Sequence, residues 1–176
     1  RNDILVLGAG AWGTAIANLL AENCHKKIFL WAYEKKVSDT INNKKINTFF
    51  LPKIKLNKNI LAINNFKGIY PVYIFIVVPS KFVYGIVKNY TKSISKHSKE
   101  KISIIICSKG FDFKRRLLLS DALKPIFPLK KIVILSGPSF ANLVALGKPT
   151  AVTIASKNLK LSNKVRDLLI NKKFRV

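Results

Sequence analysis

The stretch ILVLGAGAWGTAIANLLAEN, at positions 4–23, constrains the fold more than any other part of the sequence. The branched apolar residues of DILVLG predict a β-strand that ends at Gly8, and WGTAIANLLAEN has the apolar spacing of a helix. Gly8, Gly10 and Gly13 therefore lie in and just after a turn between a strand and a helix. Such a turn either has a purely structural role or binds a phosphate group on the free N–H groups of the helix start.

The rest of the chain alternates between short apolar runs and longer segments with helical spacing, which predicts parallel strands joined by crossover helices. We therefore expect a Rossmann-like, doubly wound α/β fold with a mostly parallel sheet, helices on both faces and one domain over residues 1–176. The segment 42–60 reads as an irregular connection. The predicted strands are 3–8, 27–33, 60–63, 73–78, 102–108, 131–137 and 149–156. The predicted helices are 12–23, 81–97, 115–125 and 159–171.

This context favours a dinucleotide as the ligand of the glycine turn. Gly8 permits the tight turn, Gly10 lets the backbone approach the pyrophosphate, and Gly13 allows the helix to pack closely on the strand. A dinucleotide site also predicts an acidic residue near the end of the second strand, where it binds the ribose hydroxyls. Glu34 is the carboxylate at that place, and the cations that follow it, Lys35 and Lys36, are suited to a 2′-phosphate. The residues alone therefore leave NAD and NADP both open.

The net charge of +24, from 32 basic and 8 acidic residues, is of the kind seen in proteins that bind nucleic acids or membrane surfaces. Here the basic residues are spread along the whole chain, and no aromatic-rich RNA-binding motif accompanies them. We interpret them as a solvated surface and expect no nucleic-acid partner. The longest apolar run, at 70–79, is about half of the roughly 20 residues that a membrane helix needs, so we expect no membrane span.

The two cysteines, Cys24 and Cys107, form no C-x-x-C motif, and Cys107 follows an apolar run that predicts a buried, reduced thiol. No signal peptide is visible, and we expect a cytoplasmic protein. The chain begins with Arg1 and contains no Met, which suggests a truncated or processed N-terminus. His25 and His97 have no partners at metal-ligand spacing and are predicted to be surface residues, so no metal site is expected.

Five motifs occur between positions 8 and 152, in the order GAGAWGTAIA, FFLPKIKL, VVPSKFV, CSKGFD and LSGPSFANLVALGKPTAV. Together they resemble the N-terminal domain of bacterial-type NAD(P)-dependent glycerol-3-phosphate dehydrogenases. The resemblance implies that dihydroxyacetone phosphate and sn-glycerol 3-phosphate are interconverted with NAD or NADP, which supplies glycerol phosphate for phospholipid synthesis. It also implies a homodimer for the intact enzyme. The family's all-helical second domain, which carries the main proton donor, is absent from these residues, so we expect negligible turnover by this chain alone.

The resemblance further implies roles for individual residues. Lys109 would contact both cofactor and substrate and act in catalysis, while Gly137 and Ser139 would line the substrate site. Pro79 and Ser80 follow another predicted central strand, and we expect them to flank the nicotinamide end of the cofactor. The cofactor-binding residues implied or considered are Gly8, Gly10, Ala11, Trp12, Gly13, Tyr33, Glu34, Pro79, Lys109 and Ala141.

Position and residue type agree with the role of Lys109. It directly follows a predicted central strand, at the strand end where open α/β sheets place their ligands. An ammonium group there can neutralise a phosphate or polarise a ketone. The alternative interpretation is that Lys109 is one of the many surface lysines. Asp112 has two possible roles: it orients the loop after Lys109, or it is a solvated loop carboxylate. We expect the second.

Two positions depart from the family pattern. Ala11 replaces the usual Ser or Thr and removes a hydroxyl that would bind the phosphates. Tyr33 replaces Arg or His near the adenosine ribose, which favours NAD over NADP. Two alternative functions remain open: the cofactor domain of another two-domain dehydrogenase, of the 3-hydroxyacid dehydrogenase or ketopantoate reductase type, and a non-catalytic nucleotide-binding module.

Overall fold

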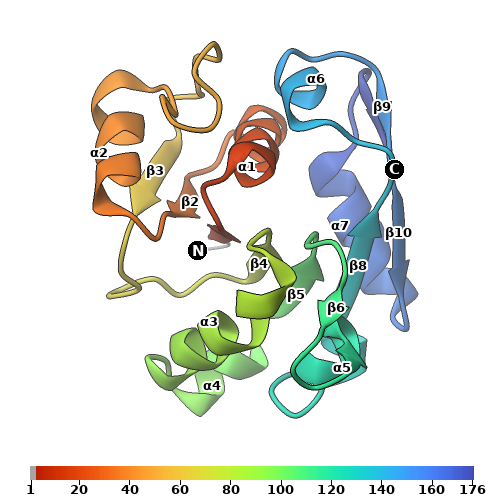
Figure 1. Cartoon of the computed structure of the whole chain (residues 1–176). Helices are drawn as coiled ribbons and strands as arrows, with labels where there is room; N and C mark the ends of the chain where they lie inside the picture. Colours follow the sequence, from red (N-terminus) through yellow and green to blue (C-terminus); the bar gives the residue numbers. More distant parts are fainter. Residues whose placement is uncertain (1–2) are drawn as a thin grey trace.

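Seven short apolar runs form one sheet in the computed structural model, which describes residues 3–176 (Figure 1). Its strands are β1 Ile4–Leu7, β2 Ile28–Trp31, β3 Ile60–Ile63, β4 Tyr73–Ile76, β5 Ser103–Ile106, β8 Ile132–Ser136 and β10 Thr153–Ser156. Their order is β10-β8-β5-β4-β1-β2-β3. All neighbours are parallel except β10, which runs antiparallel to β8. The predicted Rossmann-like, mostly parallel fold is confirmed.

Helices cover both faces of this sheet. The longer helices are α1 Ala11–Cys24, α2 Lys35–Lys44, α3 Ser80–Lys92 and α7 Leu159–Leu169, and the short ones are α4 Lys96–Glu100, α5 Leu119–Leu123 and α6 Ala141–Ala145. In Figure 1, α1, α2 and α6 lie above the sheet and α3, α4 and α5 below it. Successive strand residues point to opposite faces, so Val6 packs in the core layer with α1, α2 and α7, and Leu7 in the layer with α3 and α5.

The strand order reverses between β1 and β4, because the chain first builds outward through β2 and β3 and then returns to β4. The loops that follow β1, β4 and β5 leave the sheet at one edge, held by backbone hydrogen bonds from Gly8 to Trp31, Val77 to Leu7 and Cys107 to Ile76. Open α/β sheets bind ligands at such a reversal, beyond the carboxyl ends of the strands.

The helix predicted at 81–97 is instead two helices, and the prediction of one continuous helix is wrong. α3 ends at Lys92, and α4 begins after Ser95. The Ser95 hydroxyl accepts a hydrogen bond from the Ser98 N–H, at 3.2 Å, which caps the new helix.

The helix predicted at 115–125 is also wrong in its first half. A small antiparallel hairpin, β6 Phe111–Asp112 with β7 Leu117–Leu118, precedes α5. Residues 113–116 form its turn, which ends at Arg116 with a positive φ of 55°. Two-residue strands are too short to show a periodic pattern of apolar residues. The apolar residues of RRLLLS, by contrast, are compatible with helical spacing and led to the wrong prediction.

Asp112 is not the solvated loop carboxylate that we expected. Its side chain is buried, and it accepts hydrogen bonds from the Arg115 N–H at 3.0 Å and the Arg115 guanidinium at 2.9 Å. That guanidinium lies over the Tyr84 ring of α3, 3.4 Å from the ring centre. Burial acts to raise the pKa of Asp112, but the hydrogen bonds and the charge of Arg115 outweigh it and lower the pKa.

The C-terminal part differs from the single strand predicted at 149–156. β9 Thr150–Ala151 pairs in parallel with β11 Phe174–Arg175 in a separate sheet, and β10 closes the edge of the main sheet. A short 3₁₀ helix, Leu129–Lys131, precedes β8. Within residues 3–176, no helix combines the length and the apolar character needed to cross a bilayer.

The side chains of both histidines are exposed, as predicted. His25 ends α1 in a left-handed conformation, and His97 lies in α4. The thiol of Cys107 is buried and free, which confirms that prediction, and burial raises its pKa above the ordinary value.

Candidate functional site

Two glycines of the turn are required by close packing inside the protein. Gly8 has a φ of 118°, and a Cβ there would lie 2.9 Å from Val78 Cγ1. A Cβ at Gly13 would lie 1.8 Å from the Gly8 carbonyl oxygen, a distance that no pair of non-bonded atoms tolerates. The start of α1 therefore lies directly against the end of β1, as close helix–strand packing requires.

Gly10 differs from the other two because a Cβ there would meet no atom of residues 3–176 within 4 Å. Its φ of −69° is also one that any residue adopts. The protein itself thus gives no packing reason for a glycine, and the space beside its Cα is open to a ligand. Gly10 is the N-cap of α1, with no side-chain cap, and the N–H groups of the first helical turn have no partner within the helix. Such groups fit a pyrophosphate, since they and the helix dipole attract an anion.

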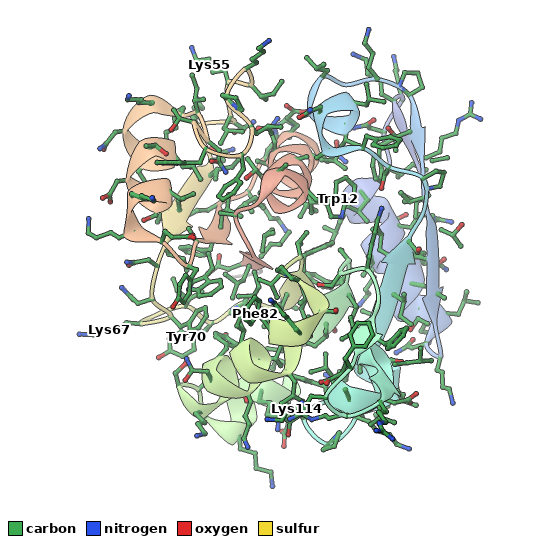
Figure 2. The ribbon with its side chains drawn as sticks, viewed as in Figure 1. Trp12, Lys55, Lys67, Tyr70, Phe82 and Lys114 are labelled. Atoms are coloured by element: carbon green, nitrogen blue, oxygen red, sulfur yellow. The ribbon has the colours of Figure 1, made fainter. Side chains whose placement is uncertain are left out.

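A cavity of about 450 Å³ lies beside this turn, at the same edge of the sheet. It brings together Trp12 from α1, Lys109 after β5, and Gly137 and Ser139 after β8. These four predicted site residues come from three separate parts of the sequence. Figure 2 shows Trp12 at the start of α1, on the side that faces β8. The remaining lining residues are Cys107, Ser108, Gly110, Ile134, Leu135 and Ser136.

Lys109 is an exposed cation that lines this cavity. Among residues 3–176 its ammonium group takes part in no ion pair. The segment that carries it is fixed at its base, because the Ser108 hydroxyl donates to the Val78 carbonyl oxygen at 2.6 Å. The charge of Lys109 is therefore free to meet an anionic or carbonyl oxygen in the cavity.

The turn after β8 is held by its own glycine. A Cβ at Gly137 would lie 2.9 Å from Val152 Cα, so this turn packs closely on the segment before β10. The Ser139 N–H donates to the Gly137 carbonyl oxygen at 2.9 Å. Ala141, the first residue of α6, is not among the residues that line the cavity and packs instead against the core layer that contains α1.

The residues predicted near the adenosine end follow β2. Tyr33 is 80% exposed and makes an edge contact with Trp31, with ring centres 6.3 Å apart. Glu34 is the N-cap of α2, and its exposed carboxylate forms no capping hydrogen bond. Both side chains thus remain available to a ligand, at the end of the strand next to β1.

The two cations that follow Glu34 have partners within the protein. Lys35 forms an ion pair with Asp39 at 2.8 Å, one helical turn further along α2. The ammonium group of Lys36 lies 5.1 Å from the centre of the Phe49 ring. Both contacts are weak, because they lie at exposed positions.

Pro79 and Ser80 lie at the start of α3, where β4 ends, as predicted. One further candidate, by position alone, is Phe82 in the first turn of α3 (Figure 2). Its ring is half exposed, and it is not among the residues that line the cavity. Sequence reasoning assigned it to the helix and missed it. The sequence feature that could have identified it is an aromatic residue at the start of a helix that follows a central strand. A surface helix usually turns its apolar side chains toward the core, so an exposed aromatic ring there is unusual. Residues 3–176 contain no cluster of three or more His, Cys, Asp or Glu side chains suited to a metal.

The strand order, the glycine turn at its reversal and the cavity beside it define a Rossmann-like domain of the dinucleotide-binding class. A family model described as the N-terminus of NAD-dependent glycerol-3-phosphate dehydrogenase matches residues 3–162. The chain therefore belongs to the NAD-dependent glycerol-3-phosphate dehydrogenase N-terminal family.

Individual relatives agree with this family. A glycerol-3-phosphate dehydrogenase [NAD(P)+] of Neorickettsia sennetsu is 36% identical over 173 residues, which is 98% of this chain and 50% of the relative. The crystal structure of the glycerol-3-phosphate dehydrogenase of Coxiella burnetii has a TM-score of 0.86 at 30% identity, covering 100% of this chain and 53% of that one. A Plasmodium falciparum structure with a TM-score of 0.87 is 23% identical and supports the fold alone. The chain spans about half the length of the curated relatives it matches.

Proposed function

We propose that residues 1–176 are the cofactor-binding domain of an NAD(P)-dependent dehydrogenase that interconverts dihydroxyacetone phosphate and sn-glycerol 3-phosphate. The observation that carries this proposal is the position of Lys109, which shares one cavity with Trp12 of the glycine turn. This position supports the proposal, because a cation suited to an anionic substrate lies next to the place where the cofactor is expected. We propose hydride transfer to the substrate for a protein with the full length of the relatives, and cofactor binding for this chain.

In this proposal the glycine turn holds the pyrophosphate of the cofactor. The N–H groups at the start of α1 would bind its oxygens, and the open side of Gly10 would admit them. Trp12 would lie against the cofactor at the edge of the cavity. Pro79 and Ala141 are proposed as further contacts of the cofactor outside that cavity. When bound, the nicotinamide supplies the hydride that reduces the carbonyl carbon of the substrate.

Lys109 would bind the substrate next to the cofactor. Its ammonium group would neutralise the substrate phosphate or stabilise negative charge that develops on the carbonyl oxygen. The Ser139 hydroxyl and the backbone at Gly137, which line the same cavity, would add hydrogen bonds to the substrate. Holding the carbonyl in one orientation lowers the entropic part of the barrier to hydride transfer.

Glu34 supports NAD as the preferred cofactor. A carboxylate at the end of β2 accepts hydrogen bonds from the ribose hydroxyls and repels a 2′-phosphate. Lys35 and Lys36, which would favour that phosphate, have partners elsewhere in the protein. Tyr33, fully available beside them, would stack on the adenine ring.

The first test is a titration of the 176-residue chain with NADH and NADPH, followed by nicotinamide fluorescence at about 0.15 M salt, which weakens nonspecific lysine contacts. We expect saturable binding, tighter for NADH. Dihydroxyacetone phosphate added to the NADH complex should change the fluorescence in the wild type, and Lys109→Met should abolish this second change. Lys157→Met, at an exposed position after β10, is the matched control. No NADH binding by a folded chain would refute the proposal.

A further inference from the structure

The segment between α2 and β3, which the sequence presents as an irregular connection, contains a completely buried polar side chain. Asn47 has no exposed surface, and Leu51 forms a backbone bridge with it. A buried amide is costly unless its donors and acceptor are satisfied. Its hydrogen-bond partners therefore indicate what it does.

Two of those partners, Ala9 and Thr14, lie in or directly after the glycine turn. The Asn47 Nδ2 donates to the Ala9 carbonyl oxygen at 2.8 Å and to the Thr14 hydroxyl at 2.8 Å. The Asn47 Oδ1 accepts from the Phe50 N–H at 3.2 Å. A carbonyl only accepts and an N–H only donates, so the partners fix which end of the amide is which. The Thr14 hydroxyl also contacts the Ala9 carbonyl oxygen, at 3.4 Å.

These contacts fix the orientation of the Ala9–Gly10 peptide. In a trans peptide the C=O and the N–H point in opposite directions, and residues 3–176 contain no cis peptide bonds. Because Asn47 and Thr14 hold the Ala9 carbonyl inward, the Gly10 N–H points away from both of them. A flipped peptide would instead turn the carbonyl oxygen outward, where it would repel a phosphate.

We propose that Asn47 is a positioning residue for cofactor binding, which holds the glycine turn in the peptide orientation that presents the Gly10 N–H to the pyrophosphate. This inference rests on the proposed function of the turn and adds a residue from outside it. Thr14 takes part as the second hydrogen-bond partner. The side chain of Asn47 itself touches no ligand, because it lies behind the turn and is completely buried.

Asn47→Asp tests this role with almost no change in shape. The new carboxylate keeps an acceptor for the Phe50 N–H but has no donor for the Ala9 carbonyl oxygen, and it favours the flipped peptide, in which the Gly10 N–H turns inward. We expect the Kd for NADH to rise about tenfold or more. Asn42→Asp is the matched control, because the Asn42 side chain also spans two backbone groups, the Ala62 C=O and N–H at 2.9 Å each, but far from the turn. That variant should lose stability and bind NADH within about twofold of wild type.

A second pair of variants covers the case in which Asn47→Asp does not fold. Thr14→Val removes the hydroxyl that accepts from Asn47, and Thr14→Ser retains it. We expect weaker NADH binding in Thr14→Val and recovery toward wild type in Thr14→Ser. Equal NADH affinity in the wild type, Asn47→Asp and Thr14→Val would overturn the inference.

The amide NMR signal of Gly10 in the cofactor-free chain separates this inference from the proposed function. A shifted or broadened Gly10 signal in Asn47→Asp, with no change in Asn42→Asp, would support control of the peptide by Asn47. An unchanged Gly10 signal would overturn it. This result is obtained even if the wild type binds no NADH, which by itself refutes the proposed function.

Discussion

Gly10 and Gly13 lack a side chain for different reasons, and the two reasons predict different defects. Gly13→Ala places a methyl group against the Gly8 carbonyl oxygen, so we expect a loss of about 3 kcal/mol in the free energy of unfolding. Gly10→Ala meets open space and should cost less than about 1 kcal/mol. It should nevertheless weaken NADH binding about tenfold, because the methyl group occupies the approach to the turn. Urea unfolding and NADH titration of both variants measure the two effects, and a Gly10→Ala variant that binds NADH normally would contradict this assignment.

Glu34 allows a second prediction at the residue scale. Glu34→Gln removes the negative charge that opposes a 2′-phosphate, so the preference for NADH over NADPH should fall about fivefold. The comparison is made by titrating both nucleotides. Glu100→Gln, in α4, is the control and should leave the preference unchanged. A preference that stays the same in Glu34→Gln would assign the selectivity to other residues, with Tyr33 the first to examine.

At the scale of elements, the β6–β7 hairpin depends on Asp112 and should respond to pH. The pKa of Asp112 is lowered from its ordinary value of 3.8, so the folded state holds the carboxylate ionised more readily than the unfolded chain does. Its contribution is therefore fully present above that ordinary value and is lost as the pH falls through the folded pKa. We expect Asp112→Asn to lose about 1–3 kcal/mol near neutral pH and the gap to wild type to close below about pH 4. Urea unfolding of both proteins across this pH range measures the difference in stability. Asp167→Asn, which changes an exposed carboxylate, is the control. A difference between Asp112→Asn and wild type that is the same at pH 3 and pH 7 would contradict the role of this ion pair.

The elements also divide into those that the sequence predicts and those that it does not. The central strands were predictable because each is an uninterrupted apolar run buried on both faces. α2 was missed because only Val37, Ser38 and Ile41 of its ten residues are buried. The antiparallel direction of β10 has no local signal, since it depends on which strand it joins.

The candidate site divides in a similar way. The glycine turn, Lys109, Gly137 and Ser139 follow strand ends, and a parallel sheet brings all such ends to one edge. Asn47 was not predictable, because a single polar residue in a loop gives no sign that it is buried beneath a distant turn.

For the whole molecule, the net charge of +24 predicts a stability that rises with salt. The structure has three ion pairs among residues 3–176, so most of the 32 basic residues repel one another without compensation. Raising KCl from about 0.01 M to about 0.1 M shortens the Debye length from roughly 30 Å to roughly 10 Å. We expect the Tm to rise by about 2–4 °C, the shift that ~1 kcal/mol produces in a chain of this size. Differential scanning calorimetry at the two salt concentrations measures it. A constant Tm would mean that repulsion among the lysines is negligible, and a falling Tm that the charge interactions stabilise the fold on balance.

The hydrogen bonds between Asn47 and the turn bear on protein engineering. The simplest way to transfer this turn to another sheet would be to graft only the six residues from Gly8 to Gly13. In this protein the turn also includes a residue that lies more than thirty positions further along the chain. A graft that transfers only the glycines would leave the Ala9 carbonyl without its donor, so a successful design would transfer the segment around Asn47 as well.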